Sequence, residues 1–236
     1  MIPRFVTFDC AQTLVHIPKT WNLGALAVDA ARKVGLNPPD GAALQYLRLY
    51  SHRLGEFWEI NRSRDMEAAD RFWHRLGYDW LTELKLPVDR LPELRDVADR
   101  LLFGDGSEVF TLFDDVIPCL DCLDRMGIRY GVVSNWDYSL HRVLKVLGIY
   151  GRFVVVKASL EEGVEKPDPR LFQIALHEAG FDPCEAMHVG DNEVDDIEGG
   201  AAASIRAVLI DRSIPKSTPW RIRTLIDLPE AFGWID

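Results

Sequence analysis

An aspartate follows a largely apolar stretch near the start of the chain, where Arg4 is followed by residues 5–8, which run into Asp9. An unbroken run of β-branched and aromatic residues is typical of a buried strand. Asp9 would then lie just beyond the carboxyl end of this strand, where open parallel α/β sheets bind their ligands. A single aspartate in such a place is also common in ordinary turns, so the pattern gains weight only if it recurs.

Two later apolar runs end in the same way. Residues 130–133 run into Ser134 and Asn135, and residues 186–190 run into Asp191. Because the carboxyl ends of parallel strands meet at one edge of a sheet, we expect the polar side chains after these runs to gather there. Ser134 and Asn135 are also suitable residues to cap the following helix, and the two roles are compatible.

The elements that position these residues alternate between strand and helix from about residue 110 onward. We expect helices at 115–126, 139–147, 169–179 and 195–203, and strands at 128–134, 153–156, 186–189 and 206–210. Alternation at this spacing predicts an α/β fold with a doubly wound, Rossmann-like parallel sheet. The tail, which contains Pro215, Pro219 and Pro229, is expected to be mostly loop.

Helical periodicity without strand signals fills the chain between Leu14 and this alternating region. We predict an all-helical cap domain of about four helices at residues 16–105, inserted into a core made of 1–15 and 106–236. An insert directly after Asp9 would be placed to cover the site as a lid. The aromatic residues on its apolar stripes are expected to form its core. They are Phe57, Trp58, Phe72, Trp73 and Trp80.

Composition limits the partners of the chain. Its 236 residues carry a formal net charge of -10, which disfavours nucleic acid and anionic membranes, since both select basic surfaces. A small anionic substrate needs only a local positive site and remains possible. Neither a leader segment nor an apolar run of membrane length is evident, so we expect a cytoplasmic protein. The sequence leaves open whether it is a monomer or a homodimer. Cys119 and Cys122 form a C-x-x-C pair on a predicted helix, without a second pair that would indicate zinc.

Four motifs in order resemble the haloacid dehalogenase-like (HAD) hydrolase superfamily, and the helical insert is similar to that family's C1 cap. The resemblance runs through the whole chain. The motifs are Phe8-Asp9-Cys10-Ala11-Gln12-Thr13-Leu14, Val133-Ser134-Asn135, the segment from Lys166-Pro167 to Phe172, and His188-Val189-Gly190-Asp191 with the acidic cluster that follows.

The resemblance implies a role for each matched residue. Asp9 matches the nucleophile that forms a covalent aspartyl intermediate, a chemistry open to carboxylates. Ser134 and Lys166 match residues that bind and neutralise the phosphoryl group, and Thr13 and Asn135, in the same motifs, complete the catalytic set that the resemblance implies. Asp191 matches a ligand of Mg²⁺, which prefers oxygen donors. The metal ligands implied by the resemblance are Asp9, the carbonyl of Ala11, Asp191 and Asp196. Asp196 would either bind the metal directly or hydrogen-bond to a group that does. By its spacing, Asp196 is favoured over Asp195 for this role.

One position departs from the phosphatases of the family, which carry a second aspartate two residues after the nucleophile. Here that residue is Ala11, which keeps a backbone carbonyl for the metal but has no proton for the leaving group. General acid catalysis typically contributes ~10²–10⁴-fold, so alkyl phosphates should be slow substrates unless His16 or another acid substitutes. The resemblance therefore implies a Mg²⁺-dependent phosphatase for a small phosphorylated metabolite, with the acid replaced.

Three alternatives stay open. A phosphonatase carries alanine at this position but needs a cap lysine for a Schiff base, and around Tyr50 the chain has Arg48 and Arg53 instead of lysine. A haloacid dehalogenase, acting on a haloacid, needs neither metal nor this acid, yet the acidic residues after Gly190 are unusual for it. A HAD-fold protein that binds a ligand without catalysis is the third alternative.

Overall fold

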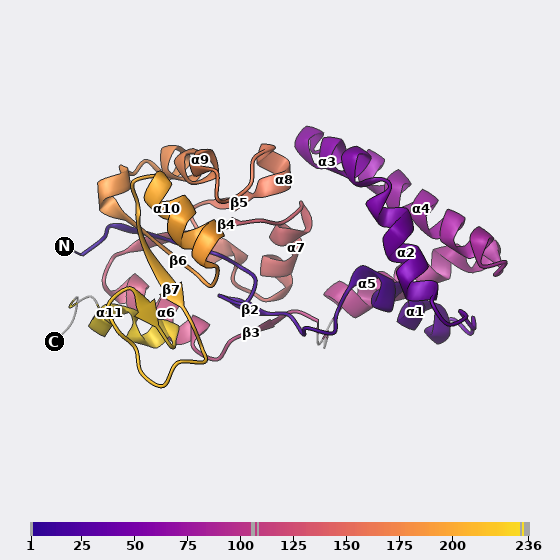
Figure 1. Cartoon of the computed structure of the whole chain (residues 1–236), viewed down its shortest axis with the longest axis horizontal. Coiled ribbons are helices and arrows are strands. Elements are labelled where there is room, and N and C mark those ends of the chain that lie inside the picture. The colour runs from indigo at the N-terminus through magenta and orange to yellow at the C-terminus, as the bar shows by residue number, and fades with distance from the viewer. Residues whose placement is uncertain (1, 105–106, 108, 232, 234–236) are drawn as a thin grey trace. The chain divides into compact units, whose positions relative to one another are not determined.

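The computed structural model of the protein describes residues 2–104, 107, 109–231 and 233. The chain divides into two compact units, one formed by Met1–His16 with Thr111–Asp236 and the other by Ile17–Phe110 (Figure 1). The predicted limits of the insert, residues 16–105, stay a prediction, and its predicted end at residues 105 and 106 falls outside the described part of the chain.

The first unit is built on a six-stranded sheet with the order β5-β4-β1-β6-β7-β8, and every neighbouring pair is parallel. Its strands are β1 (Phe5–Phe8), β4 (Arg129–Ser134), β5 (Val156–Ala158), β6 (Ala186–Gly190), β7 (Arg206–Ile210) and β8 (Arg221–Ile222). All four residues of β1 are buried, as expected for a central strand covered on both faces. The order reverses at β1, which makes the space between the carboxyl ends of β1, β4 and β6 the switch point of the sheet.

Helices cover both faces of this sheet, as a doubly wound fold requires. In Figure 1, α9 and α10 lie over one face, and α6 and α11 lie over the other. The helices of this unit are α6 (Val116–Arg125), α7 (Ser139–Val146), α8 (Ser159–Glu162), α9 (Pro169–Ala179), α10 (Gly199–Ala202) and α11 (Leu228–Ala231). Asp168 begins α9 by accepting the Arg170 amide at 2.9 Å, and Gly180 ends it with a φ of 75°. The predicted α/β core is therefore confirmed.

Short elements complete the first unit. Two-residue strands β2 (Val15–His16) and β3 (Thr111–Leu112) pair antiparallel where the chain leaves for the second unit and where it returns. The remaining turns are 3₁₀-helices η2 (Tyr150–Arg152), η3 (Pro183–Glu185) and η5 (Leu225–Asp227), and a π-helical turn η4 (Glu193–Glu198) that leads into α10. The helix predicted at 195–203 is thus a π turn followed by a short α-helix.

One strand prediction was wrong in its bounds. The third strand occupies Val156–Ala158 instead of 153–156, because Lys157 is buried inside it and bonded to Glu162 at 3.1 Å and Glu178 at 2.6 Å. The tail is largely turn and loop in its described residues, as expected, and it also contributes the two-residue edge strand β8 (Arg221–Ile222).

The regular elements of the second unit are all helices in its described residues, as predicted. It contains α1 (Leu23–Lys33), α2 (Ala42–Ser51), α3 (Leu54–Ser63), α4 (Met66–Glu83), the 3₁₀ turn η1 (Val88–Arg90) and α5 (Leu91–Phe103). About four helices were predicted here, and the structure has five α-helices among its described residues, because the segment that holds α2 and α3 is broken between Ser51 and Leu54. Phe57, Phe72 and Trp80 are fully buried, and Trp58 and Trp73 are half-buried, so most of the predicted cap aromatics do form its core.

None of the helices in the described part of the chain combines the length and the apolar character needed to cross a membrane.

Candidate active site

Three polar residues meet where the central strands end. Asp9 directly follows β1, Ser134 is the last residue of β4, and Asp191 directly follows β6. Because β1 lies between β4 and β6, these ends are neighbours, and the Asp9 amide donates to the carbonyl of Val189 at 2.9 Å. The predicted gathering of side chains at this edge is therefore found in the first unit.

The Asp9 carboxylate is held in place on one side only. It is 6% exposed, and its Oδ1 accepts hydrogen bonds from Ser134 Oγ at 2.9 Å and from Lys166 Nζ at 2.7 Å. No described residue donates a hydrogen bond to its Oδ2. One carboxylate oxygen is thus oriented by the protein while the other is free for a ligand.

Lys166 supplies a buried positive charge between two carboxylates. Its Nζ lies 2.7 Å from Asp9 Oδ1 and 2.6 Å from Asp196 Oδ1, and the side chain is almost fully buried. Burial acts to lower the pKa of Lys166, but the charges of Asp9 and Asp196 and their hydrogen bonds raise it above its usual value. The side chain therefore stays an ammonium.

Asn135 fixes the backbone from which Lys166 projects. The Asn135 side chain accepts the Lys166 amide at 2.8 Å and donates to the Lys166 carbonyl at 2.9 Å. Its amide nitrogen also lies 3.5 Å from Asp195 Oδ2. The geometry gives Asn135 contact with the lysine backbone, so it acts on the site through Lys166.

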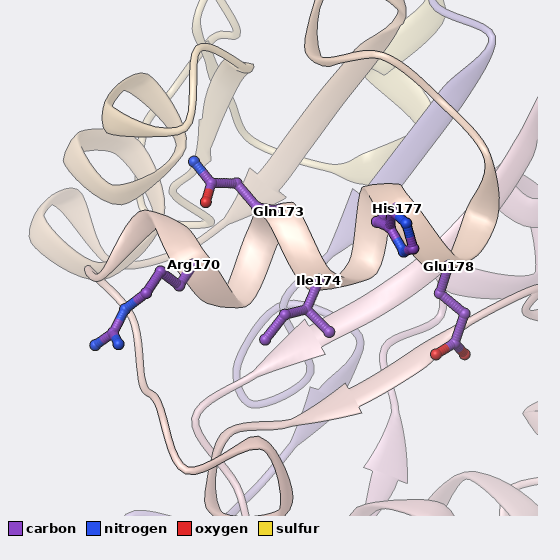
Figure 2. A pocket seen from close by; sticks show the side chains of 5 residues that line it. All are labelled: Arg170, Gln173, Ile174, His177 and Glu178. Carbon is purple, nitrogen blue, oxygen red and sulfur yellow. The ribbon is translucent and has the colours of Figure 1, made fainter.

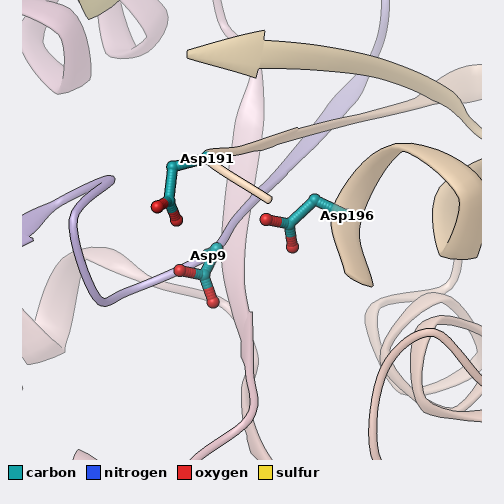
Figure 3. Close-up of side chains that lie close together, drawn as sticks. All are labelled: Asp9, Asp191 and Asp196. Atoms are coloured by element: carbon teal, nitrogen blue, oxygen red, sulfur yellow. The ribbon is translucent and has the colours of Figure 1, made fainter. Parts of the chain in front are cut away.

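Asp9, Asp191 and Asp196 form an acidic group in which one oxygen from each lies within 4.8 Å of the others. Figure 3 shows the three carboxylates turned toward a common space. Asp191 is exposed, and loss of hydration together with the charges of Asp9 and Asp196 raises its pKa to about 6. Three carboxylates share the single Lys166 ammonium, and an all-oxygen donor set with this excess of negative charge fits a hard divalent cation.

Asp196 is the most constrained of the three. It is 1% exposed, and its Oδ1 accepts from Lys166 Nζ at 2.6 Å and contacts His188 Nε2 at 3.0 Å, while Oδ2 accepts the Asn192 amide at 3.0 Å. Burial acts to raise the pKa of Asp196, but His188 and Lys166 lower it well below its usual range. Its carboxylate is therefore charged and mostly occupied by protein donors.

The remaining predicted site residues lie in the loop after Asp9. Ala11 is half-buried, and no described residue donates to its carbonyl. Thr13 is fully buried, its carbonyl accepts Arg212 Nη2 at 2.8 Å, and its hydroxyl finds no partner among the described residues. The structure therefore does not link Thr13 to the carboxylates. His16, the candidate substitute acid, is exposed in β2 beside the ring of Phe113.

Three further residues contact Asp196 or a residue bonded to it, but were not among the predicted site residues. They are Thr7, His188 and Gly190. Thr7 and His188 are buried and joined by a 2.8 Å hydrogen bond between Oγ1 and Nδ1. A Cβ atom at Gly190 would lie 2.1 Å from Cγ of Asp196, so the close approach requires glycine. The sequence did contain one signal for this contact. His188 is a single histidine in an otherwise apolar strand, and a buried histidine needs a polar partner.

A shallow hollow elsewhere on the core contains none of the predicted site residues. It is lined by Arg170, Gln173, Ile174, His177 and Glu178, which all project from α9 (Figure 2). Two of its charged groups already have partners, since Arg170 pairs with Asp168 and Glu178 with Lys157. The hollow is therefore one face of an exposed helix and adds nothing to the site at the strand ends.

Comparison with known proteins agrees with the geometry. Residues 4–204 match the haloacid dehalogenase-like hydrolase family. The human haloacid dehalogenase-like hydrolase domain-containing protein 3 is 41% identical over 217 residues, which cover 88% of this chain and 81% of that protein. A phosphoserine phosphatase from Thermus thermophilus is 40% identical over 171 residues, covering 70% of this chain and 67% of that enzyme.

Solved structures support the same relationship. A 2-haloacid dehalogenase from Pseudomonas syringae pv. Tomato DC3000 superposes with a TM-score of 0.60 at 27% identity, with all of both chains covered. The magnesium-bound HAD-hydrolase YfnB from Bacillus subtilis has a TM-score of 0.60 at 18% identity, covering 99% of this chain and 100% of that one, and shows a shared fold. The chain therefore belongs to the haloacid dehalogenase-like hydrolase family.

Proposed function

We propose that the protein is a Mg²⁺-dependent phosphatase that acts on a small phosphorylated metabolite through a covalent intermediate on Asp9. The observation that carries this proposal is the pairing of Asp9 with Lys166 and Ser134 beside the exposed Asp191. The sequence similarity to a phosphoserine phosphatase supports the reaction class.

The proposed chemistry begins with the Asp9 carboxylate. One of its oxygens attacks phosphorus, a new O–P bond forms, and the bond between phosphorus and the leaving oxygen breaks. Lys166 would offset the negative charge on the phosphoryl oxygens during this transfer, and Ser134 would hydrogen-bond to one of these oxygens and orient it. Phosphoryl transfer depends mostly on such positioning and electrostatic stabilisation. Water then attacks phosphorus, the bond between phosphorus and the Asp9 oxygen breaks, and inorganic phosphate leaves with the remaining hydrogen of the water while the other proton passes to solvent, which regenerates the Asp9 carboxylate.

The divalent cation has a suitable set of donors. Asp9, Asp191 and the carbonyl of Ala11 would hold Mg²⁺, with Asp196 adjoining them, and all are oxygen donors. Bound there, the ion would reduce the repulsion between the Asp9 carboxylate and an anionic substrate.

The position of Ala11 sets the preferred leaving group. An alkoxide needs a proton as it leaves, and alanine has none to give, whereas an aryl oxide leaves without one. We therefore expect aryl phosphates to react faster than alkyl phosphates. A haloacid also needs no leaving-group proton, which makes dehalogenation the second candidate in view of the similarity to a 2-haloacid dehalogenase.

The deciding experiment measures phosphate release from 4-nitrophenyl phosphate with and without Mg²⁺. We expect the native protein to be active only with the metal, Asp9→Asn to be inactive, and Ala11→Asp to extend activity to alkyl phosphates by up to ~10²–10⁴-fold. Asp121→Asn, an exposed carboxylate on α6, serves as the matched control for the loss of one charge. Inert native protein and inert Ala11→Asp would contradict the proposal, and chloride release from 2-chloropropionate would then test dehalogenation.

A further inference from the structure

Two buried polar residues lie side by side on the central strands, behind the carboxylates. Thr7 of β1 and His188 of β6 are register partners in the parallel pair, and they are 1% and 0% exposed. Thr7 Oγ1 lies 2.8 Å from His188 Nδ1, and His188 Nε2 lies 3.0 Å from Asp196 Oδ1. Phe172 packs edge-on against the imidazole, with the ring centroids 4.9 Å apart.

The partners of His188 determine where its proton lies. A charged carboxylate only accepts hydrogen bonds, so the nitrogen that faces Asp196, Nε2, must carry a hydrogen. The other nitrogen, Nδ1, faces the Thr7 hydroxyl, which can donate to a neutral ring or accept from a protonated one. Either arrangement keeps Nε2–H directed at Asp196, since a hydrogen bond at one nitrogen fixes the role of the other.

His188 and Lys166 share one oxygen of Asp196. Lys166 Nζ is 2.6 Å from Oδ1, the atom that His188 also contacts, and Oδ2 accepts the Asn192 amide at 3.0 Å. In contrast, no described residue donates to Oδ2 of Asp9, and no other described residue donates to the Asp191 side chain. The free oxygens of the acidic group thus belong to Asp9 and Asp191, while Asp196 is engaged by the protein.

We propose that Thr7 and His188 are positioning residues that orient Asp196 so that its carboxylate holds the Lys166 ammonium against Asp9. The roles of the acidic group are then divided, with Asp196 serving Lys166 and the cation relying on Asp9 and Asp191. The catalytic part of this inference rests on the proposed phosphatase function, but the hydrogen-bond chain and its effect on Lys166 do not.

The experiment compares His188→Leu, His188→Gln, Thr7→Val and the control His177→Leu, which replaces an exposed histidine on α9 (Figure 2). We expect His188→Leu to lower kcat for 4-nitrophenyl phosphate roughly 10–100-fold, the range seen for residues that orient active-site groups. His188→Gln should restore most of the rate, because its amide N–H can reach Asp196. Thr7→Val should give an intermediate loss.

Two readouts separate positioning from a general structural defect. Mg²⁺ affinity, measured by calorimetry, should be unchanged in His188→Leu but lost in Asp191→Asn. In ¹⁵N spectra, the Lys166 ammonium should exchange slowly with water in the native protein and in His188→Gln, and become fast or undetectable in His188→Leu. The native spectrum should also place a proton on Nε2 of His188.

Three outcomes would overturn the inference. They are a His188→Leu variant that loses Mg²⁺ affinity as strongly as Asp191→Asn, a Lys166 signal that is the same in all variants, and a native His188 with no proton on Nε2. If His188→Leu does not fold, the positioning role is still tested by the kcat and the Lys166 signal of Thr7→Val and by the proton on Nε2 of His188 in the native spectrum. If the native protein has no phosphatase activity, the proposed function fails, while the metal-binding and ¹⁵N measurements still test the positioning role.

Discussion

Gly190 and Asp196 are packed so closely that a Cβ atom at Gly190 would lie 2.1 Å from Cγ of Asp196 and 2.2 Å from its Oδ2. The glycine ends β6, and the carboxylate belongs to the turn that follows. Asp196 in turn holds Lys166 at 2.6 Å. The absence of one methyl group is therefore what allows the acidic residue, and with it the ammonium, to reach the site.

We expect Gly190→Ala to displace Asp196 and to lower both stability and activity. Forcing a methyl group into a packed site typically costs about 1–3 kcal/mol, which urea unfolding would measure. Gly151→Ala is the matched control, because a Cβ atom there meets nothing within 4 Å, and it should change stability by less than about 0.5 kcal/mol. If Gly190→Ala and Gly151→Ala have the same stability and activity, the turn that carries Asp196 can move aside for the added methyl group, and the prediction is wrong.

Arg212 and Asp115 tie the loop after Asp9 to the tail of the chain. Arg212 donates to Asp115 at 2.6 and 3.1 Å and to the Thr13 carbonyl at 2.8 Å, and its guanidinium lies 3.7 Å from the centroid of the Phe113 ring. Thr224 Oγ1 and the Leu225 amide also donate to Asp115, at 2.7 and 2.9 Å. Burial acts to raise the pKa of Asp115, but these hydrogen bonds lower it below its usual value.

A carboxyl whose pKa is lower in the folded than in the unfolded state stabilises the fold above its unfolded pKa and loses that contribution as the pH falls through the folded value. We therefore expect Asp115→Asn to lower the free energy of unfolding by about 3 kcal/mol at pH 7, the typical effect of removing one partner of a buried pair. The difference from the native protein should shrink below about pH 4. Asp121→Asn, whose partner Arg152 keeps Asp124, is the control and should show little effect. A difference that persists unchanged at pH 3 would contradict this account.

Asn135 offers a test of the backbone clamp on Lys166. Asn135→Ala removes both hydrogen bonds to the lysine backbone, and Asn135→Asp keeps the acceptor for the amide but turns a donor into a charged acceptor facing the Lys166 carbonyl. We expect kcat/KM to fall roughly 10–100-fold in each, with the aspartate variant the slower. Asn37→Ala, at an exposed position in the helical unit, should behave as the native protein. Full activity in Asn135→Ala would show that Lys166 needs no clamp.

Mg²⁺ should stabilise the native protein, because a ligand that binds only the folded state adds to its free energy of unfolding. At about a hundred times the dissociation constant we expect a rise in Tm of about 5–10 °C, reversed by EDTA. Asp191→Asn should abolish the shift, whereas Asp195→Asn, outside the acidic group, should retain it. A shift that survives in Asp191→Asn would place the cation elsewhere.

The carboxyl-end residues could be predicted because apolar runs mark the central strands so clearly. Asp9, Ser134 and Asp191 all follow such runs, and the parallel order then brings them together. The edge of the sheet was harder to predict. A charged residue such as Lys157 usually marks the end of a buried strand. Here Lys157 lies inside β5, because the carboxylates of Glu162 in α8 and Glu178 in α9 neutralise it, and the sequence alone does not show these pairings.

Contacts between side chains could not be inferred from the chain alone. The break between α2 and α3 has no glycine or proline to mark it, so the sequence gave no sign of two helices there. The bond between Thr7 and His188 depends on the register of two strands about 180 residues apart. Such pairings appear only once the order and register of the strands are known.

The short ladder of β2 and β3 has a consequence for how this chain can vary. Val15 pairs with Leu112 and His16 with Thr111, so the points where the chain leaves the sheet unit and returns to it are adjacent. A short turn joining His16 to Thr111 would close the sheet unit without opening any of its strands. The pairing thus gives the sheet unit a single insertion point, at which we expect one helical domain to be replaceable by another without a change in the fold of the sheet unit.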